Sequence, residues 1–77
     1  MKIVGKRVLV SIKDDETGLG ILSEINAYGI YLRDAYFSGG LGKPPEKLPP
    51  PSEMFWPMRR VESVQVLPDL QEDQDSA

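Results

Sequence analysis

Hydrophobic and polar residues alternate along the first third of the chain. In the run KRVLVSIK, Val8, Val10 and Ile12 fall on one face of an extended strand, and polar side chains fall on the other. A period of two is the pattern of a half-buried strand. The polar turn DDETG follows at 14–18, and the next run, LGILSEIN, contains a glycine of the kind that marks a bend or a bulge. The pattern therefore predicts two strands joined by a hairpin turn.

A third strand is expected after a very short break at residues 26–28. The run GIYLRDA alternates the aliphatic Ile30 and Leu32 with more polar positions. Two further short strands are expected in MFWPM and VESVQVLP, joined at residues 58–60. Five strands in so short a chain, without a sustained helical period, predict an all-β fold, a small, strongly bent five-stranded antiparallel barrel.

Residues 36–53 interrupt this pattern with an irregular Gly/Pro-rich insertion. The segment holds three Gly and five of the seven Pro, and proline supplies no amide donor and blocks a helix. Residues 69–77 carry four acids and no base, with little apolar surface to bury, so we expect a disordered acidic tail. The predicted organisation is a barrel over 1–68, which includes the insertion, followed by the tail.

Composition narrows the possible chemistry. The 77 residues include no Cys and no His, so thiol ligands and the commonest general base are absent. Asp14, Asp15 and Glu16 lack the ligand spacing of an EF-hand loop. We therefore expect neither catalysis nor a metal or other cofactor.

Charge and hydropathy bear on partners and location. The net charge of −3 is unevenly distributed along the chain. Residues 1–68 carry nine bases and eight acids, whereas the tail carries four acids and no base. Such a balance argues against tight nonspecific nucleic-acid binding but allows a small basic site. No run approaches the roughly 20 apolar residues of a membrane-spanning helix, and the N-terminus lacks a signal-peptide pattern. The chain is therefore expected to be cytoplasmic, without a membrane partner.

The last two strands should lie at the edges of the sheet. They are short and apolar, and unprotected edges pair readily with other chains. A domain of this size also buries only about 60% of its unfolded surface. We therefore expect a homo-oligomer. The expected contact residues are Phe55, Trp56, Val64 and Val66.

Two stretches of the chain resemble the signature blocks of a known protein family. The stretch GKRVLVSIKDDETGLGILSEINAYGIYLRDA resembles the first signature block of Sm-like proteins, and MFWPMRRVESVQV is similar to the second. The spacing of EINAYGIYLRD is closest to the bacterial Sm-like protein Hfq, without the N-terminal helix of that protein. The resemblance implies an Sm-like, SH3-like barrel that closes into a ring of five to eight subunits. In such rings the fourth strand of one subunit pairs with the fifth strand of the next.

The resemblance also implies single-stranded RNA binding at the pore face of the ring. The positions that match the family's binding loops are Asn26, Tyr28 and Gly29 in the first block and Met58, Arg59 and Arg60 in the second. An aromatic ring can stack on an unpaired base, and an arginine can neutralise phosphate or stack as well. The chain departs from the family pattern in three places: Asn26 replaces an acid, Met58-Arg59 replaces a Lys-His pair, and the insertion has no standard counterpart.

Simpler interpretations stand beside these assignments. Tyr28 can pack across a hairpin or at a subunit contact, Asn26 can bond its own backbone in a turn, and paired arginines often serve only as solvated charge or in ion pairs. A second hypothesis is a structural or protein-interaction ring without a nucleic-acid ligand. Its working surface would be the Pro-rich segment 43–51, because exposed proline segments dock into aromatic grooves.

Overall fold

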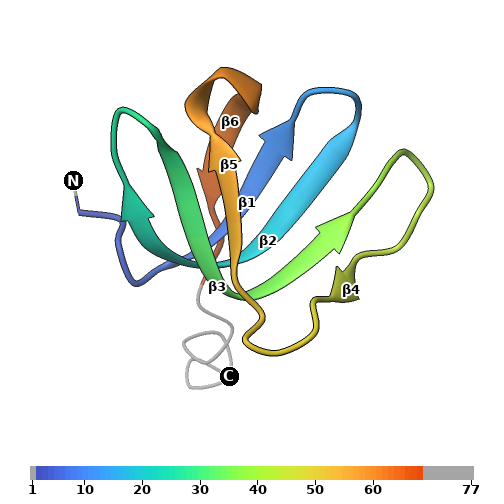
Figure 1. The fold of residues 1–77 in the computed structure, drawn as a ribbon, viewed down its shortest axis with the longest axis horizontal. Coiled ribbons are helices and arrows are strands. Elements are labelled where there is room, and N and C mark those ends of the chain that lie inside the picture. The colour runs from blue at the N-terminus through green and yellow to red at the C-terminus, as the bar shows by residue number, and fades with distance from the viewer. Residues whose placement is uncertain (1, 69–77) are drawn as a thin grey trace.

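The computed structural model describes residues 2–68, and this part of the chain is almost entirely β-structure (Figure 1). Its elements are β1 (Arg7–Ile12), β2 (Glu16–Ile25), β3 (Gly29–Ser38), β4 (Glu46–Lys47), β5 (Met54–Pro57), the 3-10 helix η1 (Met58–Arg60) and β6 (Val61–Val66). The expected acidic tail at 69–77 lies outside the described residues. No helix in the described part is long and apolar enough to cross a membrane.

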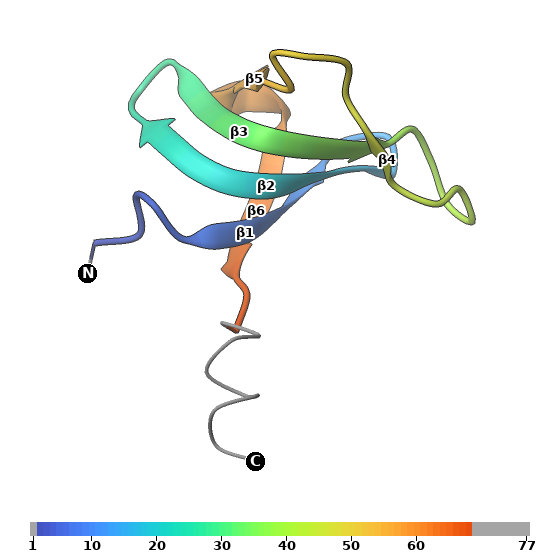
Figure 2. The ribbon, with the colours of Figure 1, turned by 90° about the horizontal axis from the view of Figure 1, so that it is seen from below.

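The strands form one bent antiparallel sheet. The order is β4-β3-β2-β1-β6, and β5 also pairs with β3. β2 and β3 curve strongly along their length (Figure 2). The glycine at position 20 lies where the β2–β3 register shifts, between Leu19 and Ile21, which confirms the predicted irregularity in this strand.

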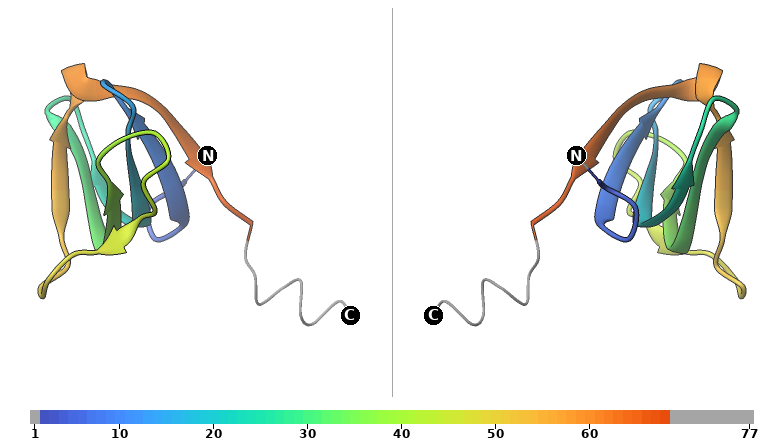
Figure 3. Two further views of the ribbon diagram at one scale, coloured as in Figure 1. Left: turned by 90° about the vertical axis from the view of Figure 1, so that its right-hand side faces the viewer. Right: turned by 90° about the vertical axis from the view of Figure 1, so that its left-hand side faces the viewer.

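The sheet is bent as expected but it is not closed. β5 pairs along one edge of β3 and β6 pairs along one edge of β1. Within residues 2–68 no pairing joins β5 to β6, and the two strands leave η1 in diverging directions (Figure 3). The physical reason is the abrupt turn at η1, which sends consecutive strands to opposite ends of the sheet. Each therefore retains an unpaired edge.

The insertion is more ordered than the composition predicted. Tyr36 and Phe37 continue β3 and pair with the two residues of β4, a sixth strand that was not expected. The segment after β4 is fixed by hydrogen bonds from the Leu48 amide to the Ala35 carbonyl and from the Ala35 amide to the Ser52 carbonyl. Glu46 and Lys47 interrupt the prolines, so both have the amides that a strand requires.

The core lies on the concave side of the bent sheet. The buried apolar residues are Val8, Val10, Ile12, Leu22, Ile30, Leu32, Ala35 and Trp56. The alternation predicted in the first and third strands is thereby confirmed. Trp56, which we expected at a subunit contact, is only 4% exposed and packs inside the single chain. Its ring stacks with Phe37 at a centroid distance of 6.3 Å. Because Phe55 and Trp56 alternate, Phe55 lies on the outer face and Trp56 points inward.

Candidate nucleic-acid interface

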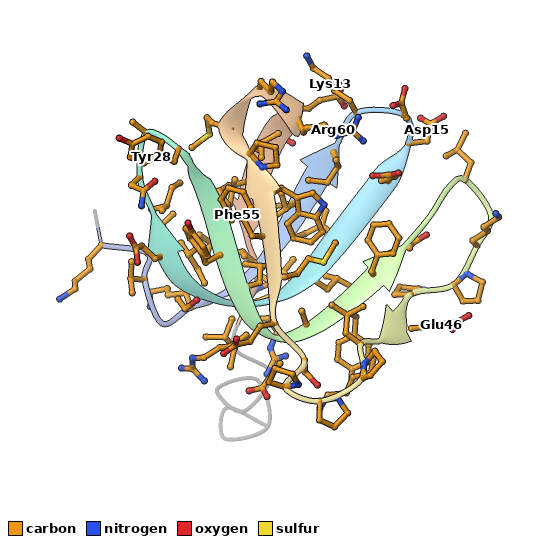
Figure 4. All side chains as sticks on the ribbon, viewed as in Figure 1. Lys13, Asp15, Tyr28, Glu46, Phe55 and Arg60 are labelled. Atoms are coloured by element: carbon orange, nitrogen blue, oxygen red, sulfur yellow. The ribbon has the colours of Figure 1, made fainter. Side chains whose placement is uncertain are left out.

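Two loops distant in sequence meet at one end of the sheet. Residues 26–28 join β2 to β3, and η1 joins β5 to β6. The Met58 amide donates to the Tyr28 carbonyl at 3.0 Å, and Gly29 pairs with Pro57. Figure 4 shows Tyr28 at the tip of its loop. The structure thus brings together the two sets of residues that the resemblance implied.

Asn26 folds the first loop with its own side chain. Its Oδ1 accepts hydrogen bonds from the amides of Tyr28 at 2.8 Å and Gly29 at 3.3 Å. Its Nδ2 donates to Glu24 Oε2 at 2.6 Å. This is the side-chain turn that asparagine readily forms. Both ends of the amide are engaged within the chain, so the observed role of Asn26 is to shape the loop.

The Asn26 turn presents Tyr28 to solvent. The residue is 81% exposed, while its backbone is fixed at both the amide and the carbonyl. Tyr28 therefore does not pack across its own hairpin within the single chain, and its packing at a subunit contact stays a prediction. An aromatic side chain on a fixed backbone is suited to stacking on a flat ligand.

Gly29 allows β5 to lie close to the loop. A Cβ built on Gly29 would lie 2.3 Å from the Trp56 carbonyl oxygen and 2.4 Å from the Phe55 ring. These distances are far below van der Waals contact. The residue therefore belongs to the site by holding the two loops together.

Arg60 turns away from Tyr28 and toward the β1–β2 turn (Figure 4). Its Nη1 donates to Asp14 Oδ2 at 3.3 Å and its Nη2 to Glu16 Oε1 at 3.1 Å. Nη2 also approaches the Lys13 carbonyl at 3.4 Å. The acidic turn therefore supplies the counter-charge of Arg60. Within residues 2–68 no group of three or more potential metal ligands occurs.

Met58 and Arg59 lie beside this ion-pair cluster. Met58 is partly buried and packs against the core. Arg59 is exposed, and its side chain has no hydrogen bond or ion pair in the part of the chain that the structure describes. Of the two neighbouring arginines, Arg59 is the one whose charge is available to a ligand.

We expect Arg60→Gln to lower the free energy of unfolding by about 0.5–1 kcal/mol, the usual range for a partly exposed ion-pair cluster. Arg59→Gln is the matched control and should leave stability unchanged. Urea unfolding at low and high salt measures the free energy of unfolding of both variants. High salt screens the ion pairs, so the difference in stability between the two variants should become smaller. Equal effects of the two substitutions would contradict the assignment of the ion pairs to Arg60.

The other expected contact residues lie on the two edge strands. Val64 and Val66 lie opposite Val10 and Val8 in the β1–β6 pairing. Val64 packs partly against the core, and Val66 is 36% exposed. Phe55 lies on β5 with its ring outward. Their contact with a neighbouring subunit stays a prediction.

Sequence reasoning did not identify the partners of Arg60 or the outward row that Phe55 joins. Asp14 and Glu16 are more than forty residues from Arg60 in sequence, so only the pairing of β6 with β1 brings them close. The row on the outer face, Glu24, Tyr31 and Phe55, depends on the registers of three strands. Alternation in β3 predicted that Tyr31 faces away from the core, but alternation could not identify its neighbours.

Comparisons with known proteins were made by sequence and by structure. No protein-family model and no curated protein matches the chain. A heptameric archaeal Sm protein superposes with a TM-score of 0.63 at 25% identity, covering 86% of this chain and 91% of that one. The SmAP1 heptamer of P. aerophilum superposes with a TM-score of 0.64 at 24% identity, covering 87% of this chain and 85% of that one.

A third solved structure is an Sm protein of Pyrococcus abyssii in complex with a uridine heptamer. It superposes with a TM-score of 0.65 at 19% identity, covering 84% of this chain and 87% of that one. The three structures share the bent antiparallel sheet rather than a closely related sequence. Particular closeness to Hfq stays a prediction. The chain therefore has the fold of Sm proteins.

Proposed function

We propose that the chain assembles into a ring and binds single-stranded RNA where the loop at 26–28 meets η1. β5 of one copy pairs with β6 of the next, and the RNA-binding end of each subunit faces the pore. The role is binding rather than catalysis. The observation that carries the proposal is the position of β5 and β6 at opposite ends of one sheet, each with an outer edge that no strand of residues 2–68 pairs, and joined by the turn that carries Arg59.

The free edges offer specific backbone groups to a neighbour. The Leu67 amide donates to the Arg7 carbonyl, and alternate residues of an antiparallel strand point their backbone groups in opposite directions. The amides of Val64 and Val66 therefore point away from β1. In the β3–β5 pairing the Met58 amide points toward the β3 side, because it donates to the Tyr28 carbonyl. Phe55 lies three positions earlier, so its amide points the opposite way, away from β3. A neighbouring copy can satisfy these groups by extending the sheet.

The structural neighbours support both parts of the proposal. Two of them are heptamers, and a third was solved with a uridine heptamer. In this chain the groups suited to such a ligand are Tyr28, with its exposed ring, and Arg59, whose exposed side chain has no ion-pair partner among residues 2–68. A ring repeats both residues around the pore, so a modest positive charge on one subunit becomes a continuous basic surface.

RNA affinity tests the site. Tyr28→Leu should weaken binding of oligo-uridine about tenfold, because base stacking contributes roughly 1–3 kcal/mol. Arg59→Gln should also weaken binding, and it should reduce the steepness of the salt dependence. Arg60→Gln should have a smaller effect than Arg59→Gln, because Arg60 is already paired. Fluorescence anisotropy of labelled oligo-uridine over a salt series provides all of these values.

Lys43→Gln is the matched control, since it removes an exposed charge from the loop before β4. It should leave affinity close to that of the parent protein. If Tyr28→Leu and Arg59→Gln bound oligo-uridine as tightly as the parent, the site would be wrong even if the ring exists.

A further inference from the structure

We propose that the outer face of β2, β3 and β5 carries a second binding site, which takes an arginine or lysine side chain from an extended segment of another protein. Three outward residues lie directly across neighbouring strands in this region. Glu24 is opposite Tyr31 in the β2–β3 register, and Tyr31 is opposite Phe55 in the β3–β5 register. They form a continuous row that begins with a carboxylate and ends with two aromatic rings.

A hollow of about 340 Å³ lies along this row. Its lining includes the row itself, the stem of Met54 and a second carboxylate, Glu53. The volume is enough for one large side chain and its flanking backbone. Phe55, over the β3–β5 part of the sheet in Figure 4, is separate from Tyr28 at the loop tip. The hollow adjoins the loop of the proposed RNA site through the Asn26–Glu24 hydrogen bond, but its lining includes none of residues 26–29 or 58–60.

The two aromatic rings form a platform that is partly exposed. The ring centroids of Tyr31 and Phe55 are 4.6 Å apart and the planes are tilted by 40°. The residues remain 38% and 41% exposed, respectively. Aromatic faces carry negative electrostatic potential and attract cations. The platform is consequently suited to a planar guanidinium or an ammonium group.

Both carboxylates at the hollow retain capacity for a ligand. Within residues 2–68, Glu24 accepts a side-chain hydrogen bond from Asn26 at Oε2, and its Oε1 accepts none. Glu53 makes no side-chain hydrogen bond or ion pair within residues 2–68. No lysine or arginine of the described chain lines the hollow. The site therefore combines negative charge with aromatic rings, and no cation among residues 2–68 lines it.

This chemistry favours a basic protein segment over a nucleic acid. Two carboxylates would repel the phosphates of RNA, whereas an arginine can stack on the rings and donate to a carboxylate at the same time. Ring assembly would place the β6 side chains of a neighbouring copy beside Phe55 at the rim of the hollow. Tyr31 and Glu24 lie one and two strands further in from that edge, so their part of the hollow would stay accessible. The inference does not depend on the proposed RNA function.

The test is a titration of the full-length protein, labelled with ¹⁵N, with two short peptides. One is acetyl-Gly-Ser-Arg-Leu-Arg-Gly-amide, and the other has citrulline at both arginine positions. Citrulline keeps the shape of arginine without its charge. The arginine peptide should shift the backbone amide signals of residues 23, 24, 31 and 53–55 in a saturable manner. The citrulline peptide should bind at least fivefold more weakly.

Two variants and one control assign the effect to the hollow. Glu53→Gln should weaken binding of the arginine peptide about two- to fivefold, as expected for one exposed charge pair. Tyr31→Leu keeps apolar volume but removes a ring, and it should weaken binding by about two- to fivefold, as expected for one exposed cation–π contact. Asp15→Asn removes an equivalent exposed charge at the β1–β2 turn and should have no effect.

Equal binding of the two peptides, or shifts centred outside the hollow, would overturn the proposal. It would also be overturned if oligo-uridine shifted the amides at 31 and 53–55 and left those at 26–28 unchanged. Loss of oligo-uridine binding in the Tyr28→Leu variant, with peptide binding retained, would show that the two sites act separately.

Discussion

Replacing Val66 by proline should leave the chain folded and reduce its assembly to single chains of 8.6 kDa. The Val66 amide points to the free edge of β6, so proline removes a donor that a neighbouring β5 would use and places its ring in the way. The residue is near the end of β6 and 36% exposed, so the pairing with β1 is largely preserved. Each contact around the ring should weaken by about 1–3 kcal/mol, and sedimentation velocity at low micromolar concentration measures the result.

Val66→Thr is the matched control, because it keeps the amide and the β-branched shape. It should sediment like the parent protein, and the far-ultraviolet circular dichroism of both variants should match that of the parent. A folded Val66→Pro variant that still sedimented as an assembly would move the subunit contact away from this edge.

Trp56→Ala should remove most of the stability of the fold. The ring is almost completely buried between Gly18 and Phe37, and truncation of a buried aromatic costs about 3–5 kcal/mol. The total free energy of unfolding of a domain of this length is roughly 3–10 kcal/mol. Thermal and urea unfolding should therefore show a sharply lowered midpoint or no cooperative transition. A loss below about 1 kcal/mol would be inconsistent with Trp56 as a core residue, since such small values are typical of surface positions.

Gly18 provides a second, independent test of the same packing. A Cβ at Gly18 would lie 2.2 Å from Trp56 Cη2, so Gly18→Ala alone should destabilise the chain by about 1–3 kcal/mol through overpacking. Trp56→Phe shortens the ring system and makes room for the methyl group. The double variant Gly18→Ala/Trp56→Phe should therefore lose less stability than the sum of the two single variants. Strict additivity would show that the two residues are not in contact.

Much of the fold could be predicted from alternation alone. Val8, Val10 and Ile12 point inward as their spacing required, and the short breaks at 26–28 and 58–60 fall where the strands end. These features depend on neighbours in sequence, where a period of two is unambiguous. The positions of the two edge strands could likewise be predicted, because both are short and neither has the lysines that protect many sheet edges.

The remaining features depend on contacts between distant segments. We expected both Phe55 and Trp56 at a subunit contact, whereas the structure buries Trp56 in the core of the single chain. The pairing of β4 with β3 depends on two residues among prolines. The partners of Arg60 are more than forty residues away in sequence and are brought close by the pairing of β6 with β1. Each of these outcomes is decided by tertiary packing that local propensity does not encode.

The central claim is that unpaired edges on β5 and β6 close the chain into a ring. Native mass spectrometry of the untagged, unmodified protein at low micromolar concentration tests it most directly. If the chain forms a ring, the spectrum should show a single species of five to eight copies of the 8.6 kDa chain. A clean monomer under the same conditions would contradict the ring and, with it, the RNA site at a pore.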